Sequence, residues 1–176
     1  MPKTGASTTT ADRQPKSRRA ELLASRVEEG AAKLAAFVER LSDAQWRQPV
    51  SATDRRTVGV VVHHVAYIYP IEIEAARAIA RGQAVETAWP AIAELNVKHA
   101  AENAEITKGA ALELLARNNR EAAAAVRAFT DEELDRAASF GLSDGATVTA
   151  QFVIEDHAMR HAWHHLAKIR EAVGRA

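Results

Sequence analysis

The sequence predicts an all-α protein that folds as an antiparallel four-helix bundle. Apolar residues recur with helical periodicity over four long segments, which are separated by loops rich in Gly, Pro, Ser and Asp. No segment predicts a β-hairpin, and no strand–helix–strand order predicts a parallel sheet. Amphipathic helices joined in this way pack as an antiparallel bundle. A chain of 176 residues is long enough to bury such a core within one domain.

Residues 1–18 are predicted to be a disordered polar tail, followed by the bundle domain at 19–176. The first twenty residues, MPKTGASTTTADRQPKSRRA, are rich in Thr, Ser, Lys and Arg. This composition buries too little apolar surface to order the chain. It also lacks the apolar centre of a secretory signal. We therefore expect a cytoplasmic protein, with a transit-like role of the tail as the alternative.

The first helix is predicted over 19–41 and ends at SDAQWRQPV, where Pro49 cannot continue it. Thr57 is placed to cap a second helix that runs from Val58 towards Ile79. The stretch TVGVVVHHVAYIYP is rich in β-branched and aromatic residues, so a strand is the alternative there. Pro70 should kink or end this helix. The apolar positions of the first helix are Leu23, Val27, Leu34, Phe37, Val38 and Leu41.

The second half of the chain contains the other predicted helices. Pro90 suits the first turn of a helix over 90–106, and the apolar pattern restarts at Thr107 and continues to Phe129. TDEE, residues 130–133, is a capping box that opens a short helix. SFGLSDGAT, residues 139–147, is predicted as a loop. The last helix runs from about Val148 to Val173.

Six of the seven histidines lie in two short stretches, and helical geometry separates those that face inward. In the last helix, His165 lies about 60° and His161 about 100° from the centre of the apolar stripe, one turn apart. In the second helix, His64 lies about 90° from the apolar stripe and His63 about 170°. Three histidines are therefore predicted to point into solvent, namely His63, His157 and His164.

His64, His161 and His165 are the candidate metal ligands, because two helices could bring their imidazoles together. The chain has no cysteine, so imidazole and carboxylate are the ligands available. Surface or singly hydrogen-bonded histidines are the alternative. His99 could line the same cleft, or it could be solvated or cap a helix. Asn96 could bind a ligand or bridge two helices.

Charge and motifs exclude several other classes of protein. Lys+Arg and Asp+Glu balance at 23 each, so we expect neither nucleic acid nor a membrane surface as partner. The longest apolar run, around residues 58–73, is interrupted by polar residues and cannot span a bilayer. A di-iron carboxylate bundle requires Glu-x-x-His pairs, and the sequence has none.

Three segments together resemble the DinB-like superfamily. LSDAQWRQPV followed by RTVGVVVHHVA resembles the turn and second helix of that family, and HAWHHLAKIREAVG resembles its closing motif. The segment from ELNVKHAAENAEI onwards is similar to the subgroup that includes mycothiol-dependent maleylpyruvate isomerase. The resemblance covers about residues 20–175 and implies a DinB-like bundle. The chain departs from the family pattern at Arg55 and Arg56, where many members have tryptophan.

The resemblance also implies ligands and partners. His64, His161 and His165 match the histidine triad of the family, which binds a divalent metal; we expect zinc, with nickel as the alternative. Related proteins often dimerise, so a homodimer is expected. Characterised members use bacillithiol, mycothiol or glutathione. The implied function is therefore thiol-dependent S-transfer or isomerisation of a small-molecule substrate.

Three functional hypotheses follow. Three neutral imidazoles leave an ion with its full charge and an open position, which lowers the pKa of a bound thiol or water. Thiol-dependent transfer is the first hypothesis. Metal-dependent hydrolysis is the second, although Glu155 and Asp156 are expected to turn away from His165, which leaves no obvious general base. A non-catalytic metal- or ligand-binding bundle is the third.

Overall fold

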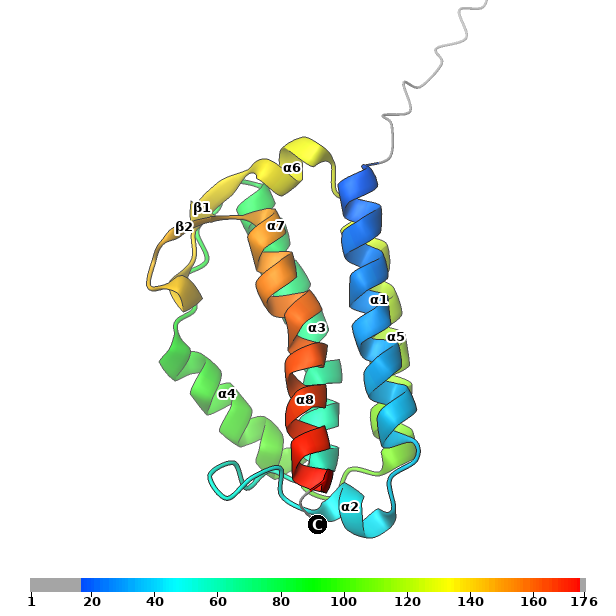
Figure 1. Cartoon of the computed structure of the whole chain (residues 1–176). Coiled ribbons are helices and arrows are strands. Elements are labelled where there is room, and N and C mark those ends of the chain that lie inside the picture. Colours follow the sequence, from blue (N-terminus) through cyan, green and yellow to red (C-terminus); the bar gives the residue numbers. More distant parts are fainter. Residues whose placement is uncertain (1–16, 175–176) are drawn as a thin grey trace, which may run out of the picture.

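The computed structural model describes residues 17–174, and four long helices form its bundle (Figure 1). They are α1 (Arg18–Val38), α3 (Val58–Ala80), α5 (Lys108–Arg127) and a final helix made of α7 (Ala150–Val153), a π-helical turn (Ile154–Met159) and α8 (Arg160–Gly174). The predicted all-α four-helix bundle is confirmed. The predicted tail lies outside the described residues as far as residue 16, and its last two residues belong to the start of α1.

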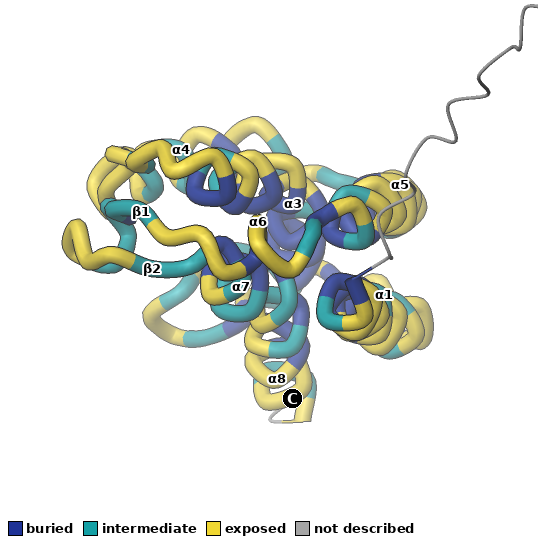
Figure 2. Tube along the Cα trace, turned by 90° about the horizontal axis from the view of Figure 1, so that it is seen from above, coloured by how far each residue is buried: buried dark blue, intermediate teal, exposed yellow. Residues whose placement is uncertain are grey.

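The order of the long helices around the bundle differs from their order in the sequence, because α1 and α3 each pack against α5 and the final helix. The start of α1 contacts the end of α5 through the Arg127–Glu21 ion pair at 3.0 Å, so these two helices are antiparallel. Trp46 lies against Gly59 near the start of α3 and donates from Nε1 to the carbonyl of Ile106, two residues before α5, at 3.0 Å. The two helices therefore start at the same end of the bundle and run in the same direction. Seen from above, α3 lies between α5 and a hairpin of two short strands, β1 (Ala137–Ser139) and β2 (Thr147–Thr149) (Figure 2). The final helix returns antiparallel to α3.

Shorter elements connect and cover the four helices. They are α2 (Asp43–Arg47), α4 (Trp89–Glu102), α6 (Asp131–Asp135), β1 (Ala137–Ser139), a 3-10 turn (Gly141–Ser143) and β2 (Thr147–Thr149). The helix predicted over 90–106 ends earlier, at Glu102, where the Asn103 side chain donates to the His99 carbonyl at 2.8 Å. As the sequence predicts, Thr130 and Glu133 form a capping box at the start of α6. No helix within residues 17–174 is long and apolar enough to cross a membrane.

The β1–β2 hairpin corrects the prediction that the chain contains none. The two strands pair antiparallel, with Ala138 opposite Val148, around the segment predicted as a loop. Each strand is only three residues long, too short to show alternation of apolar and polar residues. Asp144 and Gly145 turn the chain with φ of 53° and 77°. The hairpin therefore depends on its turn and on backbone pairing rather than on a side-chain pattern.

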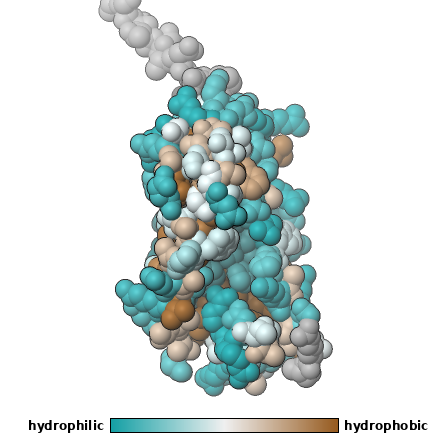
Figure 3. All heavy atoms as spheres, turned by 90° about the vertical axis from the view of Figure 1, so that its left-hand side faces the viewer, coloured by the Kyte–Doolittle hydropathy of each residue, from teal (hydrophilic) through white to brown (hydrophobic). Residues whose placement is uncertain are grey.

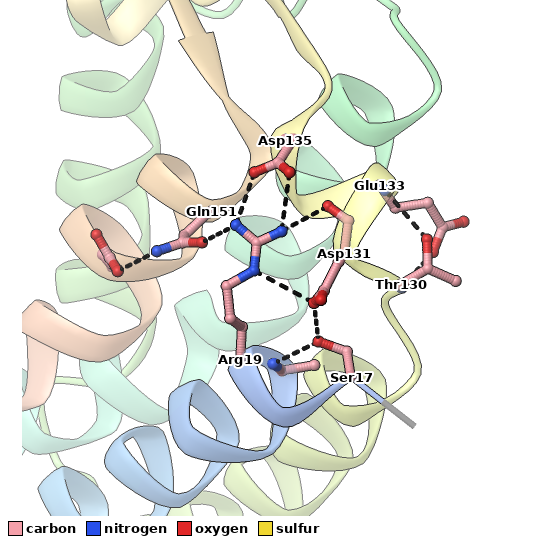
Figure 4. Close-up of polar contacts among 9 residues, drawn as sticks. Ser17, Arg19, Thr130, Asp131, Glu133, Asp135 and Gln151 are labelled. Carbon is pink, nitrogen blue, oxygen red and sulfur yellow. Dashed lines mark hydrogen bonds and ion pairs between the residues drawn. The ribbon is translucent and has the colours of Figure 1, made fainter. Parts of the chain in front are cut away.

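A polar network joins the start of α1 to α6 and α7 (Figure 4). The Ser17 side chain caps α1 and also donates to Asp131. Arg19 donates to both carboxylate oxygens of Asp135, at 2.7 and 2.9 Å, and to the side chain of Gln151 at 3.3 Å. Three segments that are distant in sequence are thereby held together at one end of the bundle.

α3 does not end at Pro70, although the sequence predicts a kink or an end there. The carbonyl that loses its hydrogen bond to proline has another donor. The helix continues through Pro70 to Ala80. Proline lacks the N–H that would bond to the carbonyl four residues earlier, at Ala66. The buried Asn118 side chain of α5 donates to that carbonyl instead, at 2.9 Å. Packing between α3 and α5 thus compensates for the hydrogen bond that proline removes.

The close contact between α3 and Trp46 generates a prediction. A Cβ added at Gly59 would lie 2.6 Å from Cε2 and 2.7 Å from Nε1 of the buried Trp46 ring. We expect Gly59→Ala to lower the free energy of unfolding by about 1–3 kcal/mol, because the ring and helix must separate. Chemical denaturation of both proteins measures this.

Gly109→Ala is the matched control, since Gly109 is likewise the second residue of its helix. Nothing lies within 4 Å of a Cβ at that position. Alanine there should stabilise the protein by up to about 1 kcal/mol, because it favours the helical backbone. Equal effects of the two substitutions would contradict the packing argument.

Candidate metal centre

The final helix contains a π-helical turn just before the histidine pair. The sequence predicts an uninterrupted α-helix there, but Ile154–Met159 bond with π-helical spacing. A π turn contains one residue more than an α-helical turn, so side chains within and after it face a different side of the helix than α-helical spacing predicts. Consequently Asp156 and His157 line a cavity rather than facing away from it. Glu155 instead accepts a hydrogen bond from Gln151 at 2.8 Å.

His64, His161 and His165 lie together between α3 and α8. Each offers one ring nitrogen such that the three nitrogens lie within 4.8 Å of one another. His64 Nε2 and His161 Nε2 are 3.1 Å apart, and the rings of His161 and His165 stack with their centroids separated by 4.8 Å. The predicted inward orientation of these three side chains agrees with this geometry. A single cation could reach all three imidazoles.

Glu72, a buried carboxylate of α3, orients one of these rings. Its Oε1 lies 2.6 Å from Nδ1 of His161, and only 6% of the residue is exposed. A carboxylate oxygen accepts a hydrogen bond from the ring, so this contact occupies Nδ1 of His161 and leaves Nε2 facing His64. Sequence reasoning missed this residue. The available signal was the first charged residue of a helix that is largely apolar up to that point, eight positions after His64.

Burial keeps the imidazoles of His64 and His165 neutral. His64 and His165 are 4% and 6% exposed. Desolvation, reinforced by the neighbouring His161, lowers the pKa of His64 to about 3 and holds the pKa of His165 well below its usual value. Nδ1 of each is buried without a hydrogen-bond partner among the described residues. The rings therefore keep their lone pairs at neutral pH.

His63 and His99 form a second contact beside this group. His63 Nδ1 lies 2.8 Å from His99 Nε2, and the two rings stack with centroids 5.0 Å apart. His99 is 4% exposed and also contacts the ring of Tyr67. His99 is therefore buried, and the alternative of a solvated ring is wrong. His63, predicted to point into solvent, is instead half-buried and contacts the His99 ring. His164 is exposed, as predicted.

A cavity of about 850 Å³ opens beside the three histidines. Its walls come from α3, residues 84–92, α4, the hairpin turn and the final helix. Asn96 of α4 lines the cavity, and its buried Oδ1 lacks a partner within residues 17–174. Figure 3 shows this side of the molecule, where hydrophobic and hydrophilic residues are mixed. The three histidines therefore face a space large enough for a small molecule.

The buried His64 should make the metal-free protein acid-labile. Its pKa is about 3 in the folded state and about 6.5 when unfolded. Between these values the unfolded chain binds a proton that the folded chain excludes, so stability falls as the pH falls. The expected loss is about 1.4 kcal/mol per pH unit below about pH 6.5.

Denaturation with a chelator present, at about pH 7.5, 6 and 5, measures this dependence. His64→Gln removes the titrating group, so the variant should lose less stability over the same range. An unchanged dependence on pH would show that His64 does not titrate as its burial implies.

Comparisons with known proteins agree with this architecture. Residues 26–169 match the DinB superfamily. Among solved structures, the chain is similar to YfiT from Bacillus subtilis, described as a probable metal-dependent hydrolase with an unusual four-helix bundle topology. The TM-score is 0.72 at 24% identity, over 93% of this chain and 91% of that chain. No curated protein matches the sequence. The family match spans most of the bundle, and the chain belongs to the DinB superfamily.

Proposed function

We propose that this protein binds a divalent metal ion through His64, His161 and His165 and uses it to activate a small molecule in the adjoining cavity. The observation that carries the proposal is the convergence of three imidazoles, two of them almost fully buried, at one cavity wall. Zinc is the proposed ion and nickel the alternative, because imidazole suits both. A cytoplasmic homodimer is part of the same proposal.

The chemistry of the donor set fits such an ion. Two nitrogens that bind one tetrahedral zinc lie about 3.3 Å apart, and those of His64 and His161 are separated by 3.1 Å. Glu72 holds the His161 ring in the orientation that presents Nε2, an arrangement common behind metal-binding histidines. Three neutral ligands also leave a coordination position open, as in catalytic rather than structural zinc sites.

Thiol-dependent transfer is the reaction we propose for this site. When bound, the ion would supply the positive charge that lowers the pKa of a weakly acidic group such as a thiol. The residues of the chain hold the rings in place, keep them neutral and enclose the reactants. A cavity of about 850 Å³ has room for a low-molecular-weight thiol beside a small electrophile. The thiol hypothesis also draws on the resemblance to thiol-using members of the family.

Hydrolysis is the second candidate, and one observation favours it. The π turn places Asp156 on the cavity wall, where the sequence had suggested no carboxylate. Asp156 pairs with Arg160 at 3.0 Å, so it would have to exchange that partner before acting as a base. The similar YfiT is described as a probable metal-dependent hydrolase. The two reactions differ in whether a thiol is consumed.

Metal binding is tested by two neighbouring substitutions. His165→Ala removes one proposed ligand and should lower zinc affinity at least tenfold, whereas His164→Ala changes an exposed ring outside the group and should not. Elemental analysis of untagged protein and competition with a chromogenic chelator give stoichiometry and affinity. Equal affinities for both variants would reject the proposed site.

The reaction is tested with zinc-loaded protein, one thiol at a time and two reporter substrates. We expect consumption of glutathione, bacillithiol or mycothiol with the electrophile 1-chloro-2,4-dinitrobenzene, and loss of that activity in His165→Ala. Hydrolysis of p-nitrophenyl acetate without thiol consumption would instead support the second candidate. Neither activity in a protein that binds zinc would reject catalysis on these substrate classes.

A further inference from the structure

Charged side chains line the cavity at several points, and several of them pair with a neighbouring side chain. Glu72 contacts His161, Glu74 pairs with Arg81 at 2.9 Å, and Asp156 pairs with Arg160. The remaining cation on the cavity wall is Arg56, which precedes the Thr57 cap of α3. Its partner and its orientation decide whether it can bind a ligand.

Asp54 binds one edge of the Arg56 guanidinium. Asp54 accepts from Nε at 2.9 Å and from Nη2 at 2.7 Å. This bidentate contact fixes the plane of the guanidinium and leaves the Nη1 donors for another acceptor. Asp54 is not among the described residues that line the cavity, whereas Arg56 is. The aspartate therefore supports the arginine from behind.

The loop that carries Arg56 is itself fixed. The Val50 amide donates to the Arg56 carbonyl at 3.0 Å, and the Asp54 amide donates to the Ser51 side chain at 2.8 Å. The Arg56 side chain is 23% exposed. A guanidinium held in one orientation loses little conformational entropy when it binds a ligand. The site is thus arranged before any ligand arrives.

Arg56 also lies close enough to the histidine group to act on the same ligand. Both line one cavity, and the positive charge of Arg56 contributes to lowering the pKa of His64, His99 and His165. The cavity wall beyond them is largely apolar. Its apolar residues include Ile68, Ile71, Ala75, Val85, Phe140 and Leu142.

From this geometry we infer that Arg56 is a specificity residue that binds a carboxylate of the substrate, while the apolar wall packs against the rest of the molecule. A carboxylate matches the planar donor edge of one guanidinium. A phosphate dianion carries a second negative charge, which the carboxylates of Glu72, Glu86 and Asp156 on the same wall disfavour. The substrate class is therefore a small carboxylic acid with an apolar body. This inference names the substrate of the proposed function and rests on it for the reaction.

The test uses metal-free protein, so that a bound ion cannot attract the anion itself. Hexanoate, neutral hexanamide and inorganic phosphate are titrated separately, and Kd is taken from NMR shifts of cavity-lining amides. We expect hexanoate to bind more tightly than hexanamide or phosphate. Arg56→Gln should weaken hexanoate binding about tenfold and leave hexanamide binding unchanged.

Arg55→Gln is the matched control, because it removes the same charge from the adjacent, exposed position outside the cavity. It should change none of the three affinities. Arg56→Lys keeps the charge but not the planar edge, so it should lose less affinity for hexanoate than Arg56→Gln. If Arg56→Gln fails to fold, the hexanoate affinity of Arg56→Lys tests the inference in its place.

Three outcomes would overturn the inference: no preference for hexanoate over hexanamide, equal losses in Arg55→Gln and Arg56→Gln, or phosphate binding more tightly than hexanoate. Zinc affinity is measured on the same wild-type sample. A protein that prefers hexanoate through Arg56 but binds no zinc would reject the proposed function and leave the carboxylate site standing. The reverse result would reject only the carboxylate site.

Discussion

The antiparallel packing of α3 against the final helix is the contact on which the histidine group depends. His64 lies near the start of α3, and His161 and His165 lie on the helix that returns beside it. Antiparallel neighbours place the beginning of one helix opposite the end of the other, so residues about a hundred positions apart in sequence meet. Glu72, two turns further along α3, then reaches the far side of His161. One helix thus supplies an imidazole and also the carboxylate that orients a second imidazole.

Placing imidazoles in this interface costs stability, and the fold tolerates that cost. Buried polar atoms without partners destabilise a protein, and Nδ1 of both His64 and His165 is in that position. Apolar side chains from all four long helices form one core, and the Arg19 network joins α1 to α6 and α7 at one end of the bundle. A rigid, desolvated histidine cluster is unfavourable for folding but suitable for a ligand that can use its lone pairs.

Helical geometry predicts the inward-facing histidines from the sequence, whereas other features of the site depend on backbone spacing or tertiary contacts that no sequence pattern contains. His64, His161 and His165 were identifiable because apolar stripes fix the inward face of each helix. The π turn was not, since it changes the hydrogen-bond spacing without a change in composition, and it rotates Asp156 and His157 towards the cavity. The continuity of α3 through Pro70 depends on a tertiary hydrogen bond from Asn118, which no local pattern contains. Glu72 likewise acquires a role only when α8 supplies His161.

Glu72 and Arg56 carry opposite charges near the same histidines, but the two side chains differ in burial and in their partners. Glu72 is 6% exposed and touches His161, so its negative charge acts on the rings themselves and favours a cation among them. Arg56 is less buried, lies on the cavity wall and has its own carboxylate partner behind it. Electrostatic interactions strengthen where water is excluded, so both charges act more strongly in this cavity than on an open surface. The proposed ion and the carboxylate that we infer for Arg56 would therefore share one cavity, which would hold a substrate beside the ion that activates its reaction partner.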